Sequence, residues 1–356
     1  MEATAHSLPS LPSSLGVLTV TLDQGARSVR SELGELDDAS PLVREGRWGD
    51  LRGAMAERGY LYVRGLIPRE AVLRCRRHVM ECLHKDGMIA EEDGGEEGKE
   101  GKQRGTGTQQ GAQQGTGTGK GREGEGAGAS GTSGASGANS ASGANSANRA
   151  NIELGKIKAG QRGVHMSGRR QVTHAEAALR VLEAREVRDF FGGLMGEPAA
   201  TFETKWMRVM GQGEQTTAHS DAYFFRCGEG NDDNMYTCWI PLGDVMPDQA
   251  PLAVCEASHL LGGFGVHRPD ELPEAFAGAG GTAEDAVWRS ARYEAGDVVV
   301  FDERTIHAST RNTRDCFRIR FVWWGVGCVG GREGEREGGR EGGREGERER
   351  GSEIYI

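Results

Sequence analysis

Large apolar side chains are missing from a long internal stretch of this chain. Residues 91–150 contain no valine, isoleucine, leucine, methionine, phenylalanine, tyrosine, tryptophan or cysteine. Such a segment cannot bury enough apolar surface to offset the entropy lost on folding. A second run, residues 330–351, consists of glycine, arginine, glutamate and little else. We therefore expect a disordered glycine-rich insert at 91–150 and a disordered tail at 330–356, which leaves roughly 270 residues to fold.

Paired cysteine motifs and long apolar runs are also absent. The seven cysteines form no CxxC pair, and several lie within apolar segments, so reduced core thiols are expected instead of a disulfide framework. No segment is apolar enough to span a membrane. No basic stretch followed by an apolar run marks a secretory signal. These absences predict an intracellular, cytoplasmic protein and leave import into an organelle open.

An excess of basic residues is lacking as well. The formal net charge is −10, whereas a nucleic-acid-binding protein usually has a basic face. The tail has regularly spaced arginines, but glutamates are interleaved with them, which is typical of a solvated segment. We expect a monomer that acts on a small-molecule substrate and has no nucleic-acid partner.

The residues that can fold are patterned first as helices and then as strands. Residues 1–41 are weakly patterned, and we expect them to be loose. Helical spacing of apolar residues predicts helices at 48–58, 68–87 and 173–194, the last with Thr173 and Glu176 at capping-box spacing. Seven short apolar segments separated by Gly and Pro turns follow between 201 and 326. This order predicts a mainly β domain at 42–329, a double-stranded β-helix (jelly roll, cupin-like) with flanking helices.

The stretch "HSDAYFF" places His219 and Asp221 two residues apart. On a strand, such residues point to the same face, so they can bind one metal ion together. Among the other histidines, His307 is the best third ligand, because it follows the apolar strand "DVVVFD". Two histidines and one carboxylate on one face of an octahedron are typical of non-heme Fe(II) oxygenases. A surface histidine beside an incidental aspartate is the alternative.

Arg318 follows His307 by eleven residues, in "FRIRFVWW". Arg318 and Arg320 share one face of the expected strand, and Ile319 and Phe321 share the other. A guanidinium inside a barrel is costly unless it is paired. A dicarboxylate co-substrate would pair it in a bidentate manner.

With these motifs the chain resembles the phytanoyl-CoA dioxygenase family of Fe(II)- and 2-oxoglutarate-dependent oxygenases. The resemblance covers residues 59–324 and includes "GYLYVRGLIPREAV", "TCWIPLGD", "APLAVCEASH" and "EAGDVVVFDERTIHASTRN". It implies that Fe(II) is held by His219, Asp221 and His307, with 2-oxoglutarate as co-substrate, O2, and ascorbate as a candidate reductant. Because Asp221 is present, the resemblance favours hydroxylation of an unactivated C–H bond over halogenation.

The resemblance also implies roles around the co-substrate. Arg318 and Ser309 would bind the distal carboxylate of 2-oxoglutarate, and Asn312 matches another residue of the family motif. Trp239 would line the co-substrate pocket, although a plain core position is the alternative for it. His259 stands in "ASH" where the family often has Gly-Ser-His, and we expect it to be structural.

The prime substrate is not specified by these motifs. A small organic molecule or an acyl, lipid-like compound fits the resemblance, and a CoA ester is one candidate. Residues 223–225 (Tyr-Phe-Phe) could form a pocket wall, and residues 227–234 and 262–286 are expected lids. Two other functions stay open: a cupin-type metal dioxygenase that does not use 2-oxoglutarate, and a non-catalytic binding protein on the same fold.

Overall fold

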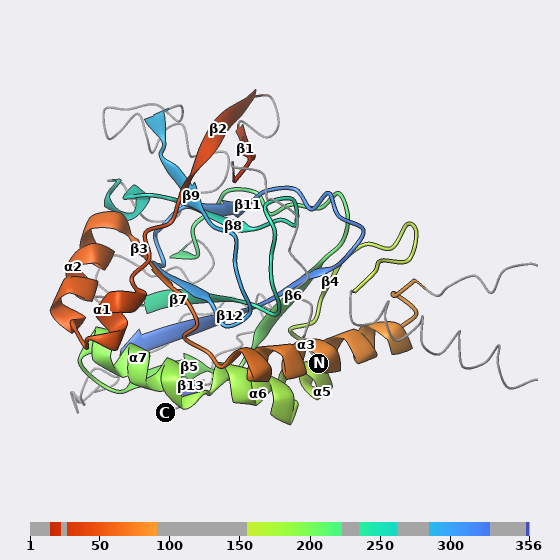
Figure 1. Cartoon of the computed structure of the whole chain (residues 1–356), viewed down its shortest axis with the longest axis horizontal. Coiled ribbons are helices and arrows are strands. Elements are labelled where there is room, and N and C mark those ends of the chain that lie inside the picture. The colour runs from red at the N-terminus through yellow and green to blue at the C-terminus, as the bar shows by residue number, and fades with distance from the viewer. Residues whose placement is uncertain are drawn as a thin grey trace, which may run out of the picture. The chain divides into compact units, whose positions relative to one another are not determined.

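Two mainly antiparallel sheets face each other across an apolar interior in the computed structural model (Figure 1). The structure describes residues 15–22, 27–90, 155–222, 235–261, 285–327 and 354–355. All of these belong to one unit, which residues 1–90 and 152–356 form. The insert expected at 91–150, most of the expected tail, the Tyr-Phe-Phe wall and nearly all of the expected lids lie outside the described residues.

The smaller sheet has five strands in the order β1-β2-β9-β8-β11. Its members are β1 (Val17–Leu22), β2 (Arg27–Glu35), β8 (Leu252–Cys255), β9 (Trp288–Ser290) and β11 (His307–Ser309). All neighbours are antiparallel except β2 and β9, which pair in parallel. This sheet carries one of the predicted metal-binding residues, His307, on β11.

The larger sheet has eight strands. Its main path is β13-β5-β12-β7-β10-β3, and β6 joins β12 to β4. The members are β3 (Tyr60–Val63), β4 (Val164–His165), β5 (Ala199–Phe202), β6 (Trp206–Met210), β7 (Met235–Pro241), β10 (Val298–Asp302), β12 (Arg318–Gly327) and β13 (Ile354–Tyr355). The two facing sheets form the predicted double-stranded β-helix.

Helices cover the outer face of the larger sheet, as Figure 1 shows for α3, α6 and α7. The helices are α1 (Ser40–Arg44), α2 (Trp48–Arg58), α3 (Arg69–Lys85), α5 (Arg170–Thr173), α6 (Glu176–Leu182) and α7 (Arg185–Met195), with a short 3-10 turn at Ser258–Leu260. Gly59 ends α2 with φ of +80°, a conformation that glycine adopts without strain. No helix of the described residues has the length and apolarity to cross a membrane.

Side chains along β12 alternate between two hydrophobic cores, one on each face of the larger sheet. Ile319, Phe321 and Trp323 face the helices and join the core that lies between helices and sheet. Val322 and Trp324 face the other way and join the core between the two sheets. Because strand residues alternate between faces, Arg318 and Arg320 share the inner face with these two. The predicted separation of the arginines from Ile319 and Phe321 is therefore confirmed.

Two expectations differ from the structure. Residues 15–22 and 27–41 are not loose: they form β1, β2 and the start of α1, and Leu18 and Leu33 pack against Trp288 in a small core of their own. The helix expected at 173–194 is two helices, α6 and α7. Ala175 caps α6, and Thr173 ends the preceding turn α5, so the predicted capping box is wrong.

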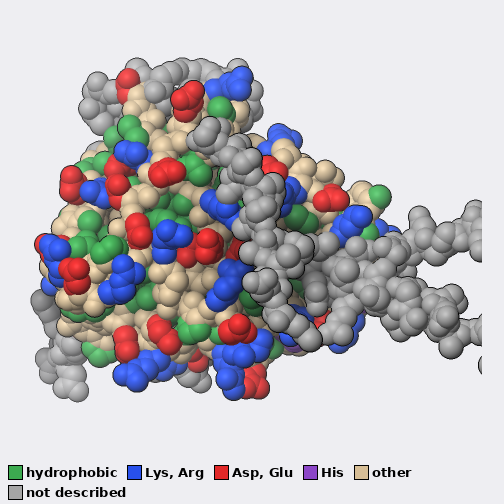
Figure 2. Space-filling model, viewed as in Figure 1, with side chains coloured by type: hydrophobic (Ala, Val, Ile, Leu, Met, Phe, Trp, Pro, Cys, Tyr) green, Lys and Arg blue, Asp and Glu red, His purple; other side chains and the backbone are tan. Residues whose placement is uncertain are grey.

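The cysteines and the charged surface residues agree with what the composition predicts. The described cysteines are all free thiols: Cys75, Cys82, Cys238, Cys255 and Cys316. Figure 2 shows acidic and basic side chains mixed over the face in view, without a patch of one sign. Ion pairs such as Arg180–Glu176 and Arg185–Asp189 follow helical i, i+4 spacing. The absence of a nucleic-acid partner stays a prediction.

Candidate metal centre and cavity

The main chain brings His219 and His307 together. His219 lies in a single antiparallel bridge with His307 of β11. The His219 N–H donates to the His307 carbonyl at 3.0 Å, and the His307 N–H donates back at 2.8 Å. The two imidazole ring centres are 4.2 Å apart. This pairing ends after one residue, so the strand expected from His219 onward is wrong: Asp221 lies in a turn.

Backbone carbonyls orient both imidazoles. Nδ1 of His219 lies 2.8 Å from the carbonyl of Thr217, and Nδ1 of His307 lies 3.1 Å from the carbonyl of Thr305. A carbonyl only accepts hydrogen bonds, so each Nδ1 carries the proton. The lone pair of each ring is therefore on Nε2, which faces Asp221. Fixing the tautomer in this way is a common feature of histidines that bind metals.

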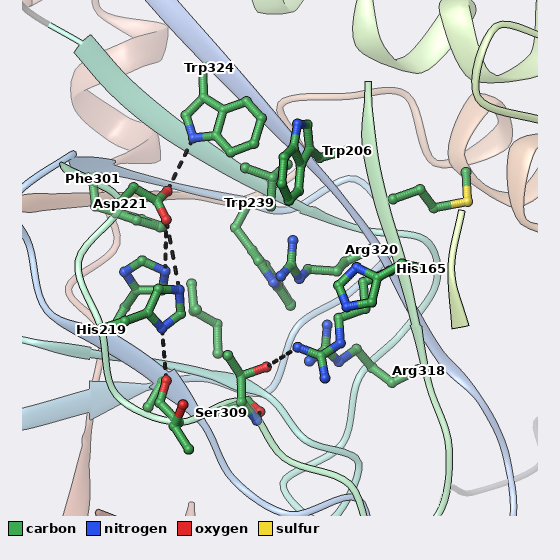
Figure 3. Close-up of a pocket in the computed structure, with 18 residues that line it drawn as sticks. His165, Trp206, His219, Asp221, Trp239, Phe301, Ser309, Arg318, Arg320 and Trp324 are labelled. Atoms are coloured by element: carbon green, nitrogen blue, oxygen red, sulfur yellow. Dashed lines mark hydrogen bonds and ion pairs between the residues drawn. The ribbon is translucent and has the colours of Figure 1, made fainter. Parts of the chain in front are cut away.

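Asp221 uses its two oxygens differently (Figure 3). Oδ2 accepts hydrogen bonds from the hydroxyl of Thr237 at 2.7 Å and from the indole N–H of Trp324 at 3.1 Å. Oδ1 lies 3.8 Å from Nε2 of His219 and 3.7 Å from Nε2 of His307. One oxygen is thus held by the larger sheet, while the other faces the imidazoles.

These three residues form the one group of histidine, cysteine or acidic side chains in the described part of the chain that could hold a metal ion. Their donor atoms lie within 4.8 Å of one another. Donors about 2.1 Å from one ion and on one face of an octahedron are about 3 Å apart, so the three donors have to move closer together when a metal binds. Two imidazole nitrogens and one carboxylate oxygen are donors that suit iron.

Burial sets the protonation states of this group. It lowers the pKa of His219, and it lowers that of His307 to about 3 with help from the neighbouring His219. Burial opposes ionisation of Asp221, but the two imidazoles and the donors of Thr237 and Trp324 outweigh it, so the pKa of Asp221 is lowered. Neutral imidazoles beside a carboxylate are the protonation states that metal binding requires.

A cavity of about 480 Å³ opens beside the three residues, and its volume suits a small-molecule site. Arg318 is 2% exposed and lies on the cavity wall. Its Nη2 contacts the sulfur of Met210, and its guanidinium lies 5.9 Å from the ring centre of Trp239. Nε and Nη1 are buried without a hydrogen-bond partner. Burial, with Arg320 and Arg208 nearby, lowers the pKa of Arg318.

The other predicted residues fall into two groups. Ser309 and Trp239 line the cavity, and the Ser309 hydroxyl accepts a hydrogen bond from the Thr216 N–H at 2.8 Å. Asn312 does not line it. The Asn312 amide donates to the carbonyls of Gly211 and Cys316 at 3.2 and 3.0 Å, so it holds the turn before β12. His259 lies outside the cavity lining, with Nε2 3.0 Å from the carbonyl of Ala56.

Several residues of the site were not foreseen from the sequence. They are the two donors to Asp221, Thr237 and Trp324, and three residues that line the cavity: His165, Trp206 and Arg208. Trp324 could have been found by continuing the two-residue period from Arg318 along β12. His165 and Arg208 had no such signal, because β6 pairs with β12, and β4 with β6, from distant parts of the chain.

A jelly roll that gathers two imidazoles and a carboxylate at one side of its cavity has the fold and the donor set of non-heme iron oxygenases. Residues 55–320 match the family model described as phytanoyl-CoA dioxygenase (PhyH). Because this match spans well over half of the sequence, the chain belongs to the phytanoyl-CoA dioxygenase family. It is therefore an enzyme that uses iron and 2-oxoglutarate.

Solved structures with a similar fold are distant in sequence. The epimerase SnoN, in complex with Fe3+, alpha ketoglutarate and nogalamycin RO, has 14% identity and a TM-score of 0.47 over 80% of this chain and 85% of its own. EctD from S. alaskensis, with 2-oxoglutarate and 5-hydroxyectoine, has 13% identity and a TM-score of 0.47 over 78% and 75%. The carbocyclase SnoK has 17% identity and a TM-score of 0.45 over 78% and 83%. No curated protein matches the sequence significantly. At these identities and scores the neighbours carry no information about the substrate.

Proposed function

We propose that this protein hydroxylates an unactivated C–H bond of a small organic substrate, with Fe(II) held by His219, Asp221 and His307. The observation that carries the proposal is the arrangement of three donors around one point beside a cavity. Bound iron lets O2 oxidise 2-oxoglutarate to succinate and CO2, while the second oxygen atom enters the substrate C–H bond as a hydroxyl group.

The orphaned donors of Arg318 support the use of 2-oxoglutarate. A buried guanidinium with two unpartnered N–H groups is costly, and the distal carboxylate of 2-oxoglutarate offers it two acceptors. We assign this carboxylate to Arg318 and Ser309, which both line the cavity. Trp239 lies beneath the guanidinium and restricts it to one side of the cavity.

The remaining residues orient the three metal-binding side chains and exclude water from them. Carbonyls of Thr217 and Thr305 hold the imidazoles, and Thr237 with Trp324 holds the carboxylate. Phe301, whose ring centre lies 4.5 Å from that of His307, covers the histidines with apolar surface. Because these groups are fixed before any ligand binds, little reorganisation is required of the chain when the reaction begins.

The first test measures the co-substrate reaction without a prime substrate. Purified protein with Fe(II), 2-oxoglutarate and O2 should form succinate slowly, and omission of iron should stop it. Iron binding without any consumption of 2-oxoglutarate would instead indicate a cupin-type dioxygenase. Protein that neither binds iron nor forms succinate would indicate a binding protein on this fold.

The second test concerns Arg318. Arg318→Gln should raise the concentration of 2-oxoglutarate needed for half-maximal turnover by about 30- to 1000-fold, because a charge-assisted bidentate pair contributes about 2–4 kcal/mol. Iron affinity, measured by anaerobic titration, should change little. Arg320→Gln is the control on the same strand face. A larger effect from Arg320→Gln than from Arg318→Gln would reassign the co-substrate carboxylate.

A further inference from the structure

Three basic side chains stand in a row on the cavity wall opposite the metal-binding residues. His165 of β4 is directly opposite Arg208 of β6, and Arg208 is directly opposite Arg320 of β12. All three line the cavity. Figure 3 shows Arg320 and His165 on the other side of the cavity from His219 and Asp221. We call His165, Arg208 and Arg320 the cationic row.

The cationic row makes no ion pair within the described part of the chain. Arg320 makes no hydrogen bond or ion pair there, and Arg208 donates only to the hydroxyl of Thr216, at 3.3 Å. Glu214 attracts Arg208, but its ion pair is with Arg162, at 3.4 Å, and Glu214 does not line the cavity. Like charges directly opposite each other destabilise a sheet, so this arrangement has a cost that folding alone does not explain.

Electrostatic effects agree with this geometry. Burial and Arg208 together lower the pKa of Arg320 to about 10. Burial, with Arg208 and Arg320, also lowers the pKa of His165. Both guanidinium groups still carry their charge at neutral pH, and an anion between them would relieve their repulsion.

The co-substrate does not supply that anion. Fe(II), Asp221, Arg318 and the 2-oxoglutarate dianion together have no net charge, so the charges of Arg208 and Arg320 are left over. Asp221 is the acidic residue among those that line the cavity, and its oxygens are committed to Thr237, Trp324 and the imidazoles. Within the described residues no other acidic side chain lines the cavity, which favours a second ligand as the source of another anionic group.

An aromatic surface adjoins the cationic row. Trp206 is two residues before Arg208 on β6, and its ring centre lies 5.3 Å from that of Trp324 in an edge-to-face pair. Trp206 is 41% exposed, although it is a large apolar residue, and it lines the cavity. Apolar surface beside two cations suits a ligand that has an apolar body and one anionic group.

We propose that the prime substrate is such an organic anion, whose carboxylate or phosphate binds Arg208 and Arg320 and whose apolar body packs on Trp206 and Trp324. This inference rests on the proposed function, because it needs Arg318 to be occupied by 2-oxoglutarate. The anionic group is anchored on the wall opposite the metal-binding residues, so the body of the substrate extends toward the reacting centre. His165, which is exposed, lies at the outer end of the row.

The test measures, in the absence of oxygen, how tightly simple probe molecules bind to protein that is loaded with Fe(II) and 2-oxoglutarate. Isothermal titration calorimetry measures the Kd of octanoate, octyl phosphate and octanol, which share one apolar chain. Octanoate or octyl phosphate should bind at least about tenfold more tightly than octanol. The tighter of the two anions identifies the headgroup. Equal binding of octanol and both anions would overturn the proposal.

Variants locate the anion site. Arg320→Gln and Arg208→Gln should each weaken the tighter anion by about tenfold or more and affect 2-oxoglutarate much less than Arg318→Gln does. Arg188→Gln, on the exposed face of α7, is the control for loss of a distant charge. Circular dichroism verifies folding of each variant.

Unchanged anion binding in both folded variants would overturn the proposal, as would a loss of 2-oxoglutarate affinity equal to that of Arg318→Gln. If the wild-type protein does not bind 2-oxoglutarate, that result counts against the proposed function instead. Octanoate binding is then measured in the absence of 2-oxoglutarate.

Discussion

Asp221 is the residue on which the metal-centre assignment depends most. It is buried, and it supplies both an oxygen donor and a negative charge that offsets the charge of the metal. Asp221→Ala should abolish succinate formation and Fe(II) binding. Ser220→Ala changes an adjacent buried residue that does not line the cavity, and it should retain both. Activity in folded Asp221→Ala would contradict the assignment.

Trp324 and Trp323 are neighbours on β12 with opposite roles. The indole N–H of Trp324 donates to Asp221, whereas that of Trp323 is buried without a partner among the helices. Trp324→Phe should weaken Fe(II) binding by about 10- to 100-fold, the usual effect of losing a partner behind a metal ligand.

Trp323→Phe is the matched control, because it removes an N–H group that makes no hydrogen bond. It should leave iron affinity unchanged. Titration of Fe(II) into both variants without oxygen measures the difference. Equal affinities in the two variants would show that the Trp324 hydrogen bond does not position Asp221.

At the scale of elements, the metal-binding group joins the two sheets. His307 belongs to β11 of the smaller sheet, and Asp221 is hydrogen-bonded to β7 and β12 of the larger one. Fe(II) at 100 times its Kd should stabilise the fold by about 2.7 kcal/mol, a rise of about 5–10 °C in Tm. Calorimetry with and without a chelator measures this. The stabilisation should be absent in Asp221→Ala.

Elements that have a regular local pattern were predictable from the sequence. The alternation in "FRIRFVWW" placed Arg318 and Arg320 on the inner face of β12, as the structure confirms. The neighbourhood of His219 was not predictable in this way. Its pairing partner, His307, is 88 residues away, and the pairing covers one residue only. Local propensity favours a strand there, but the chain turns at Asp221, which places the carboxylate under Thr237 and Trp324.

Contacts between distant segments explain the other differences. The amino-terminal strands were missed because β2 is stabilised by its parallel pairing with β9, more than 250 residues later. The cationic row was missed for the same reason, since register across β4, β6 and β12 brings its members together. The two-residue period of a strand shows which face of the sheet a side chain is on. It does not show which residue lies beside it on the next strand.

At the scale of the whole molecule, the two ends that flank residues 91–150 meet. Ile89 is paired with Ile157, the Ala90 N–H donates to the Lys156 carbonyl at 3.0 Å, and the Lys158 N–H donates to the Met88 carbonyl at 3.0 Å. We propose that residues 91–150 are an insertion within a single domain at 42–329. The family match from 55 to 320 continues on both sides of it.

Replacement of residues 91–150 by a short glycine-serine linker should therefore leave the thermal transition nearly unchanged. Loop-closure cost grows only by about 0.6 kcal/mol per doubling of length, so shortening should stabilise the domain slightly. Differential scanning calorimetry of the two proteins is the measurement. A loss of several degrees in Tm would show that the insert contributes to packing.

The position of the metal-binding group between the two sheets has a consequence for the life of the protein in a cell. Proteases degrade the fraction of molecules that is transiently open, and this fraction follows the free energy of unfolding. A stabilisation of about 2.7 kcal/mol changes the open fraction by about 100-fold. Iron shortage would then reduce the amount of this enzyme as well as its activity, and newly supplied iron would restore full activity only as fast as new chains are synthesised.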